Sequence, residues 1–305
     1  MISVYLNIYN KKYALINIKV NKFLCAILTS DNIDNCIRAV NSFPPHANIV
    51  IVCNTLKNNY YKELTVHPAL KDLTLVQTQS NGTPGKGKQS VIEYFLSTDF
   101  DYLIQIDGDD FLYPEGYDLV KDYVNINDVD VLGLLNEDIL IDDRLFVDWR
   151  NFDFSSITST LNLKHPEKME KYFRDVFSLI VQEGCVFNRI ICVSRKGAEN
   201  ISWNDKLPGT EDVLLSAQLK YLHLKGELTY HLLENSEIYL YNKQTNNGTG
   251  FKALTSDPDF CREHFFSNLT SNQISLLNKN KLPYAKHEPK RTKFSRMKYV
   301  KKLIK

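Results

Sequence analysis

Short apolar runs alternate with amphipathic stretches along residues 22–110. Continuous apolar runs of this length are typical of strands that are buried on both faces of a sheet. The stretches between them carry apolar residues at helical spacing, as Cys36, Ile37 and Val40 do before Pro44. This alternation predicts an α/β fold with a mostly parallel central sheet and flanking helices. The predicted strands are residues 23–28, 48–53, 73–78 and 102–106, and the predicted helices are residues 34–43 and 90–97.

The segments on either side of this pattern predict further elements and three regions of the chain. Residues 3–20 predict two strands around a polar turn at residues 10–12. The second half predicts helices at 115–123 and 210–224 and strands at 129–135 and 238–241. The predicted regions are a β-hairpin extension (1–21), a central α/β domain (22–245, with halves 22–110 and 111–245) and a C-terminal helical appendage with a basic tail (246–305).

Composition narrows the class of protein. The 305 residues are 43% hydrophobic and 24% charged, which excludes a coiled coil, a disordered chain and a small disulfide scaffold. The six cysteines form no CxxC pair and mostly lie in apolar runs, so we expect buried thiols in a reducing compartment. No basic and apolar leader follows Met1, and no apolar run approaches about 18 residues, so we expect a soluble cytoplasmic protein.

Charge is distributed unevenly along the chain. The 37 basic and 36 acidic residues nearly balance, but residues 286–305 carry nine lysines and arginines and one acid, Glu288. The preceding 285 residues hold 28 basic and 35 acidic groups, a net charge of −7. A basic tail on an acidic body indicates contact with an anionic surface, either the inner face of a membrane or nucleic acid. A solvated helical tail is the alternative interpretation.

The sharpest chemical motif is Asp107-Gly108-Asp109-Asp110, which directly follows the predicted strand 102–106. In open α/β sheets, ligands bind outside the carboxyl ends of the strands. Asp107 and Asp109 are separated by one glycine, so both carboxylates can approach one hard divalent cation. The motif therefore predicts a Mg²⁺ or Mn²⁺ site that also meets substrate phosphates, with a solvated acidic turn as the alternative.

A glycine-rich and basic segment lies between the third predicted strand and the next helix. Residues Gly82 to Lys88 match the start of a phosphate-loop pattern, but Gln89 stands where that pattern needs Ser or Thr. We interpret residues 81–89 as a flexible basic loop in which Lys86 or Lys88 approaches a nucleotide. An ordinary surface loop with solvated lysines is the alternative.

The third motif is Thr210-Glu211-Asp212, at the start of the predicted helix 210–224. Thr210 is a good N-cap, and acidic residues in a first turn favour the helix dipole, so a structural role accounts for the motif. Adjacent residues point about 100° apart on a helix, so one carboxylate of the pair at most serves a given target.

The order and spacing of these motifs resemble the GT-A fold glycosyltransferases, and family 2 in particular. In that family a first buried strand ends near Thr or Ser, a second strand meets the nucleotide base, an apolar strand ends in DxDD, and a Glu-Asp helix follows later. The matching segments here are residues 28–31, 51–54, 107–110 and 210–212, and the resemblance covers roughly residues 22–245.

The resemblance implies a donor site and a metal site. The donor would be a nucleoside-diphosphate sugar, with a UDP-sugar favoured. Asp109 would ligate Mn²⁺ or Mg²⁺, Asp107 would reach the ribose or the metal, and His231 is the best-placed third ligand. The residues that would line the nucleotide are Thr29, Ser30, Asp31 and Asn54, with Lys88, Asp107 and Gly108 nearby. Cys53-Asn54 and Lys88-Gln89 depart from the aspartate pair and the Arg-Asn pair that are usual in the family.

The same resemblance implies the reaction. Asp212 would be the general base for an acceptor hydroxyl, and Glu211 would orient the acceptor or the helix. Attack from the face opposite the leaving group would invert the anomeric carbon. The Gln-x-x-Arg-Trp motif of processive synthases is missing, which implies a non-processive hexosyltransferase with a saccharide or glycolipid acceptor.

Two other functions stay open at the level of sequence. The first is an ATP- or GTP-binding phosphotransferase that uses the phosphate-loop-like segment Gly82–Lys88. The second is a non-catalytic protein that binds nucleotide sugars, or nucleic acid through the basic tail.

Overall fold

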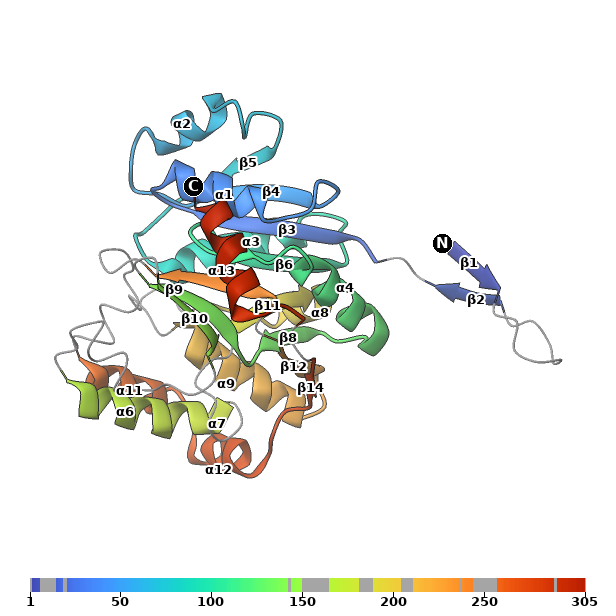
Figure 1. Cartoon of the computed structure of the whole chain (residues 1–305). Helices are drawn as coiled ribbons and strands as arrows, with labels where there is room; N and C mark the ends of the chain where they lie inside the picture. Colours follow the sequence, from blue (N-terminus) through green and yellow to red (C-terminus); the bar gives the residue numbers. More distant parts are fainter. Residues whose placement is uncertain are drawn as a thin grey trace.

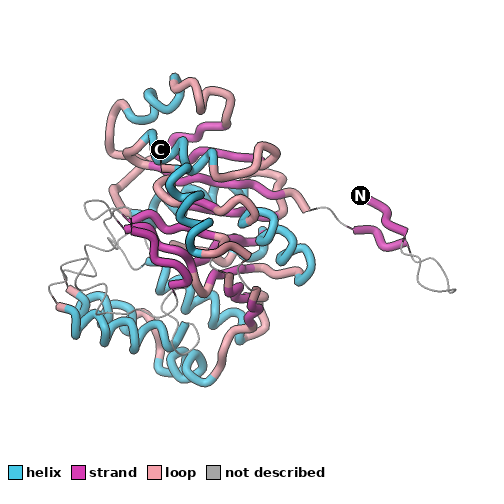
Figure 2. The backbone as a smooth tube through the Cα atoms, in the orientation of Figure 1, coloured by secondary structure: helices cyan, strands magenta, loops and turns pink. Residues whose placement is uncertain are grey.

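An eight-stranded sheet forms the centre of the protein (Figures 1 and 2). Its strands are β3 (Phe23–Thr29), β4 (Asn48–Cys53), β5 (Thr74–Gln77), β6 (Tyr102–Asp107), β8 (Val131–Leu134), β11 (Arg189–Ser194), β12 (Tyr230–Glu234) and β14 (Tyr284–Lys286). They lie in the order β14-β12-β8-β11-β6-β3-β4-β5, and within this described sheet β11 alone runs antiparallel to both of its neighbours. The predicted α/β fold with a mostly parallel sheet is therefore confirmed.

Two smaller sheets accompany the central one. The computed structural model describes residues 2–5, 15–18, 21–141, 144–149, 165–180, 189–203, 211–235, 237–243, 257–287 and 290–304. Near the N-terminus, β1 (Ile2–Tyr5) pairs antiparallel with β2 (Leu15–Ile18). The third sheet has the order β10 (Arg144–Trp149), β9 (Glu137–Ile141), β13 (Tyr239–Lys243) and β7 (Phe111–Leu112). Because β7 directly follows the acidic motif after β6, residues 107–110 connect the central sheet to this third sheet.

Helices cover both faces of the central sheet, because successive residues of a strand point to opposite faces. In β3, Leu24 and Ala26 belong to one hydrophobic core, and Cys25 and Ile27 belong to the other. The first core includes residues of α3 (Pro84–Leu96), α6 (Pro166–Tyr172), a π-helical turn (Phe173–Phe177), α7 (Ser178–Ile180), α8 (Arg195–Glu199), α9 (Glu211–Leu224), α11 (Pro258–Ser267) and α12 (Ser271–Lys279). The second includes residues of α1 (Ile33–Asn41), α2 (Tyr60–Val66), α4 (Gly116–Asn127) and α13 (Lys293–Leu303).

The glycine-rich basic segment is the start of helix α3. Thr83 caps this helix by accepting a backbone N–H of its first turn (3.4 Å). Pro84 occupies a first-turn position, where its missing N–H costs no intrahelical hydrogen bond. A Cβ at Gly87 would lie 3.1 Å from the Leu28 side chain, so glycine lets the helix pack closely on β3. The prediction of a flexible loop over residues 81–89 was therefore wrong from Pro84 onward.

The C-terminal segment, which the sequence predicted as a helical appendage, is built into the body of the protein. β14 pairs with β12 at the edge of the central sheet, and α13 lies across the second core, where Val300 is buried (Figure 1). Arg296, on the same face of α13, is also buried and pairs with Asp138 Oδ1 (2.8 Å). Within the described ranges, no helix is both long enough and apolar enough to cross a membrane.

Replacement of Arg296 should destabilise the protein strongly. Asp138 is fully buried, so Arg296→Met leaves an uncompensated carboxylate in the core, and we expect the free energy of unfolding to fall by about 3–5 kcal/mol. Urea denaturation followed by circular dichroism would measure the change. Lys298→Met is the matched control, because Lys298 is exposed on the same helix and its loss should change stability by about 0.5 kcal/mol or less.

Lys220 should make the free energy of unfolding increase as the pH rises above about 8. Its buried ammonium donates to the carbonyl groups of Leu179 (2.7 Å) and Leu277 (3.1 Å), and burial lowers its pKa to about 8. The unfolded chain keeps an ordinary lysine pKa of about 10.4, so between these values the unfolded state binds more protons and stability rises with pH. From pH 8 to pH 9.5, wild type should gain about 1–2 kcal/mol relative to Lys220→Met in urea denaturation. Parallel pH profiles of the two proteins would contradict this role.

Candidate active site

The carboxyl ends of three adjacent strands bring the predicted donor-site residues together. β3 lies between β4 and β6 and is parallel to both. The Gly108 N–H donates to the Leu28 carbonyl group (2.7 Å), and the Asn54 N–H donates to the Thr29 carbonyl group (2.9 Å). A Cβ at Gly108 would lie 2.8 Å from the Leu28 carbonyl oxygen, so this position of the acidic motif accepts a side chain only if the backbone shifts.

The side chains of two predicted donor-site residues, Thr29 and Asn54, make hydrogen bonds at the ends of β3 and β4. The Thr29 hydroxyl is buried and shares a 2.6 Å hydrogen bond with the Tyr60 hydroxyl. The Asn54 amide, also buried, donates to Thr78 Oγ1 (2.7 Å). Two further predicted residues are exposed in the loop after β3, Ser30 and Asp31. Of these four predicted residues, Ser30 and Asp31 therefore have side chains that are open to a ligand at the carboxyl ends of the strands.

A buried ion pair joins the start of α3 to the start of α9. Lys88 Nζ lies 2.8 Å from Glu211 Oε1 and 3.9 Å from Asp212 Oδ2, and its ammonium lies 4.8 Å from the centre of the Trp203 ring. The Lys88 and Glu211 side chains are only 12% and 4% exposed. Burial alone would lower the pKa of Lys88, but the two carboxylates outweigh it and hold that pKa above its usual range. Lys88 is therefore a permanent cation that fixes the first turn of α9.

A second cation, Arg189 at the start of β11, lies beside the acidic motif. Its Nε donates to Glu137 Oε2 (2.9 Å), and its guanidinium lies 4.2 Å from the centre of the Tyr239 ring. One terminal nitrogen lies 3.5 Å from Asp107 Oδ2 and 3.6 Å from Asp110 Oδ2. Arg189 thus bridges the last residue of β6 to the third sheet.

The last acid of the motif, Asp110, has a structural role. It is fully buried and accepts hydrogen bonds from the Tyr239 hydroxyl (2.7 Å) and the Asn242 N–H (2.8 Å) of β13. These bonds fix the turn between the two sheets. Asp107 and Asp109 are the two carboxylates of the motif that remain available to a ligand.

Carboxylates outnumber cations around the acidic motif. Among the described residues, Asp107, Asp109, Asp110 and Glu137 lie around Arg189, while the nearby Lys88 is held by Glu211 and Asp212. Burial, reinforced by the charge of Asp107, raises the pKa of Asp109 to about 6. A divalent cation would relieve this excess of negative charge, because it favours the ionised form of each carboxylate that it binds.

His231 does not lie with these two aspartates. It lies on β12, which β8 and β11 separate from β6, a distance of about 14 Å at the usual spacing of strands. Its Nδ1 is 3.3 Å from the Tyr123 hydroxyl of α4, and burial lowers its pKa. Among the described residues, no group of three or more His, Cys, Asp or Glu side chains is placed to hold a metal ion. A Mg²⁺ site commonly combines one or two carboxylates with substrate phosphates and water, and Asp107 and Asp109 could supply the carboxylates.

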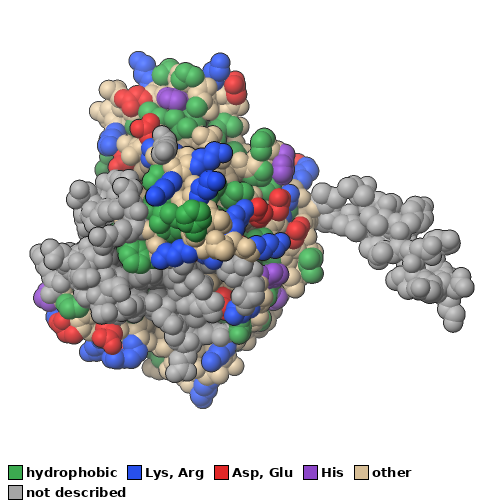
Figure 3. Space-filling view, viewed as in Figure 1, with side chains coloured by type: hydrophobic (Ala, Val, Ile, Leu, Met, Phe, Trp, Pro, Cys, Tyr) green, Lys and Arg blue, Asp and Glu red, His purple; other side chains and the backbone are tan. Residues whose placement is uncertain are grey.

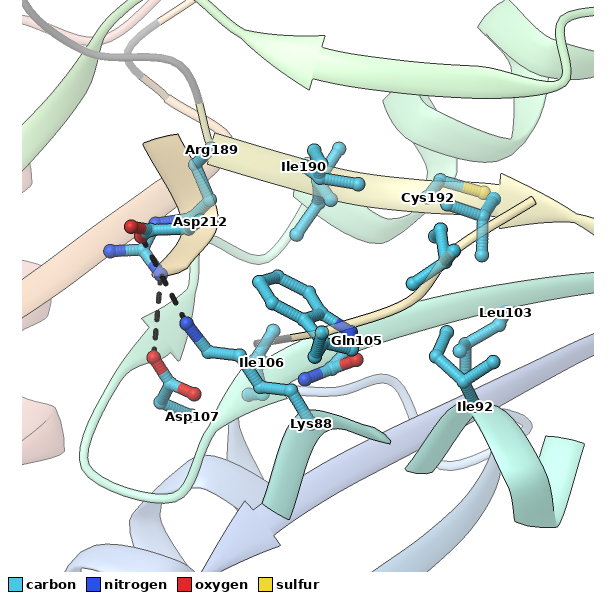
Figure 4. A pocket seen from close by; sticks show the side chains of 14 residues that line it. Lys88, Ile92, Leu103, Gln105, Ile106, Asp107, Arg189, Ile190, Cys192 and Asp212 are labelled. Carbon is cyan, nitrogen blue, oxygen red and sulfur yellow. Dashed lines mark hydrogen bonds and ion pairs between the residues drawn. The ribbon is translucent and has the colours of Figure 1, made fainter. Parts of the chain in front are cut away.

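A cavity opens between the acidic motif and the start of α9 (Figure 4). The charged residues at its mouth are Lys88, Asp107, Arg189 and Asp212. Half of the Asp212 side chain is exposed (52%), and its Oδ1 accepts the adjacent Val213 N–H (3.0 Å). Asp212 is therefore the accessible carboxylate of the Glu211-Asp212 pair, and Glu211 is the buried one.

Sequence reasoning did not find Arg189 or Glu137. Neither belongs to a motif, and their ion pair joins positions 52 residues apart, so no local signal marks it. Trp203, which belongs to none of the sequence motifs, also lines the cavity. Thr210, the predicted cap of α9, lies outside the described residues.

Comparison with known proteins gives a fold likeness at low sequence identity. No protein-family model matches the sequence, and no curated protein matches it. The similar solved structures include S. aureus TarS 1-349 in complex with UDP, with a TM-score of 0.49 and 14% identity over 84% of this chain and 69% of that chain. The complex of TarS 1-349 with UDP-GlcNAc gives a TM-score of 0.48 and 14% identity over 75% and 60% of the two chains. A longer S. aureus TarS structure gives a TM-score of 0.46 and 14% identity. That match covers 73% of this chain and 37% of the longer TarS chain.

Proposed function

We propose that the protein is a glycosyltransferase that moves a sugar from a nucleoside diphosphate, by the family resemblance UDP, to an acceptor hydroxyl. The observation that carries the proposal is that one cavity mouth holds both Asp107, at the carboxyl end of β6, and Asp212, at the start of α9. The reaction needs a group that stabilises the departing diphosphate and a base that takes the acceptor's proton. These two groups must lie on different sides of the transferred sugar, as the ends of β6 and α9 allow.

A divalent cation, Mn²⁺ or Mg²⁺, fits the acidic motif. Asp107 and Asp109 would hold it, since Asp110 is committed to β13 and the charge around Asp109 is otherwise unbalanced. When bound, the metal neutralises the charge that develops on the diphosphate leaving group. Arg189 limits the repulsion among the carboxylates at this end of the cavity.

Asp212 takes the proton of the acceptor hydroxyl in the proposed reaction. The carboxylate is half exposed and so can meet an acceptor, whereas Glu211 is held by Lys88 and keeps the first turn of α9 in place. The base need not have a raised pKa, because the hydroxyl becomes acidic only as its oxygen bonds to the anomeric carbon. Attack from the side of Asp212 inverts that carbon. We propose single addition of a hexose to a saccharide or glycolipid.

The phosphate-loop alternative is less consistent with the contacts of Lys88. In such a loop the lysine must reach the β- and γ-phosphates of a nucleotide. Lys88 instead lies inside helix α3 with its ammonium buried against Glu211. Phosphate binding there would require this ion pair to break.

A thermal-shift screen would test the proposal. UDP, GDP, dTDP, CMP and ATP would each be added with and without Mn²⁺. We expect one nucleoside diphosphate, UDP, to raise Tm only when Mn²⁺ is present, because a ligand at 100 times its Kd adds about 2.7 kcal/mol to stability. Stabilisation by ATP alone would overturn the proposal in favour of the phosphate-loop function.

The outer face of α13 supports a second, peripheral contact. Between residues 290 and 304 the sequence contains no acid, and Phe294 is 81% exposed. The basic residues exposed on or beside the helix are Lys290, Lys293, Lys298, Lys301 and Lys302. Figure 3 shows Lys and Arg side chains gathered over this face of the molecule. We propose that this face binds an anionic membrane, where each basic residue contributes about 1 kcal/mol.

Charge reversal would test the membrane contact. The triple variant Lys298→Glu, Lys301→Glu and Lys302→Glu should lose sedimentation with phosphatidylglycerol vesicles, which wild type should show at low salt. The control carries the same charge change at exposed lysines outside α13 (Lys62→Glu, Lys71→Glu, Lys225→Glu). If both triple variants lose vesicle binding equally, net charge accounts for the binding, and a contact through α13 is contradicted.

A further inference from the structure

Arg189 has hydrogen-bond donors to spare at the mouth of the cavity. A guanidinium carries five N–H groups in one plane. Its Nε donates to Glu137, and its contacts with Asp107 (3.5 Å) and Asp110 (3.6 Å) both come from one terminal nitrogen, Nη1. These two distances exceed about 2.9 Å, the usual upper length of a charge-assisted hydrogen bond. Within the described part of the chain, the second terminal nitrogen, Nη2, donates no hydrogen bond.

Aromatic rings and Glu137 hold this guanidinium in place. Its central carbon lies 4.2 Å from the centre of the Tyr239 ring and 5.2 Å from that of Tyr241. The Arg189 side chain is still 22% exposed and lines the cavity mouth (Figure 4). Stacking uses a face of the planar group, and Glu137 takes its Nε–H. The edge with the two terminal nitrogens is therefore the part that a ligand can meet.

The edge of a fixed guanidinium matches a phosphate group. It can donate two parallel hydrogen bonds to two phosphate oxygens, which a lysine ammonium does not do. Of the two cations at this mouth, Lys88 is the less available, because its ammonium lies 2.8 Å from Glu211. Arg189 lies instead beside Asp107, the end of the cavity at which the proposed reaction places the diphosphate.

We propose that Arg189 is a catalytic residue that donates hydrogen bonds to the β-phosphate of the donor. The inference rests on the proposed function, in which the transferred sugar lies between Asp107 and Asp212. The β-phosphate is the phosphate bonded to that sugar, so it is the one nearest the cavity mouth.

The contact stabilises the charge that transfer creates. The acceptor oxygen bonds to the anomeric carbon while the bond from that carbon to the β-phosphate oxygen breaks. The electron pair of the broken bond stays on the phosphate oxygen, and the acceptor's proton goes to Asp212. Arg189 keeps its protons and donates hydrogen bonds to the phosphate as its negative charge grows.

Calorimetric binding of UDP and UMP tests this contact, because UMP lacks the β-phosphate. With Mn²⁺ present, Arg189→Lys should weaken UDP binding at least tenfold and change UMP binding by less than about threefold. The lysine keeps a cation for the buried Asp110 and Glu137, so the variant should fold. Its single ammonium replaces the bond to Glu137 and leaves no terminal nitrogen for the phosphate.

A second variant removes the cation together with its buried partner. Arg189→Met combined with Glu137→Gln leaves no unpaired carboxylate at position 137, and UDP binding should weaken by about 10–100-fold. UMP binding should again stay within about threefold, which reports that the nucleotide site is folded. A weaker metal site cannot explain the loss, because removing a cation beside Asp107 favours metal binding.

Arg262→Met is the matched control. Arg262 makes the same kinds of contact away from the cavity, since its Nε donates to Asp175 (2.8 Å) and its guanidinium lies 5.1 Å from the centre of the Phe266 ring. Its replacement should leave the affinities for both nucleotides within about threefold of wild type.

The outcomes separate the inference from the function on which it rests. If wild type binds UDP with Mn²⁺ but the Arg189 variants keep that affinity, the phosphate contact is wrong and the transferase proposal stands. Equal losses of UDP and UMP affinity also overturn the contact, because they indicate a structural role for Arg189. If wild type does not bind UDP with Mn²⁺, the proposed donor site and this inference fail together.

Discussion

Asp212→Asn should lower kcat for glycosyl transfer by about 10²–10⁴-fold, the usual contribution of a general base. Asparagine keeps the shape of the side chain and can still accept the Val213 N–H, so the start of α9 should stay intact. What is lost is the ability to accept the acceptor's proton. Affinity for UDP with Mn²⁺ should remain as in wild type, because Asp212 does not take part in holding the diphosphate. Initial rates of UDP release with acceptor present would measure the effect.

The matched control for this variant is Asp118→Asn. Asp118 is also an exposed acid in the first turn of a helix, α4, but it does not line the cavity. Its replacement should leave kcat unchanged. A rate for Asp212→Asn within about threefold of wild type would exclude Asp212 as the base, because even a modest general base contributes more.

Asp109→Asn should abolish the stabilisation that UDP confers in the presence of Mn²⁺. At 100 times Kd that stabilisation is about 2.7 kcal/mol, and the variant leaves the metal one carboxylate of the pair, Asp107, beside a neutral amide that binds a divalent cation more weakly. Transfer activity should be lost with it. Thermal shift and calorimetry with UDP, each with and without Mn²⁺, would measure the loss.

The ligand-free stability of the same variant should change in the opposite direction. Burial and the charge of Asp107 both disfavour the ionised Asp109, so a neutral amide should raise the Tm of the free protein. A variant that is more stable alone but no longer stabilised by UDP cannot be explained by misfolding. Retained Mn²⁺-dependent stabilisation by UDP would remove Asp109 from the proposed metal site.

The first half of the fold could be predicted from sequence because its signals are local. The apolar runs that became β3, β4 and β6 are buried on both faces, and such strands need no long-range information to be recognised. The acidic motif follows β6 directly, so its place at the carboxyl edge of the sheet followed from the strand itself. The glycine-rich segment was misjudged, because its cap at Thr83 and Pro84 outweighed the glycines that suggested a loop.

The second half of the fold could not be predicted from sequence, because its strands and ion pairs join residues that are far apart along the chain. Arg189 begins an antiparallel strand inserted between β6 and β8, and no periodicity in the sequence reports strand order. The same strand order separates His231 from the acidic motif. The sequence of the C-terminal basic segment predicted a tail, yet its Arg296 is paired with Asp138, which lies 158 residues earlier in the chain.

Local sequence patterns were sufficient to predict the α/β architecture, the acidic strand end and the helix that carries Asp212, since each depends on residues within one or two turns or one strand. Which buried charges meet depends on the tertiary structure: Lys88 pairs with Glu211, and Arg189 pairs with Glu137. The physical reason is that hydrophobic periodicity records only which face of an element is buried. The partner of a buried polar side chain is set by the order in which distant elements pack, and that order determines the site.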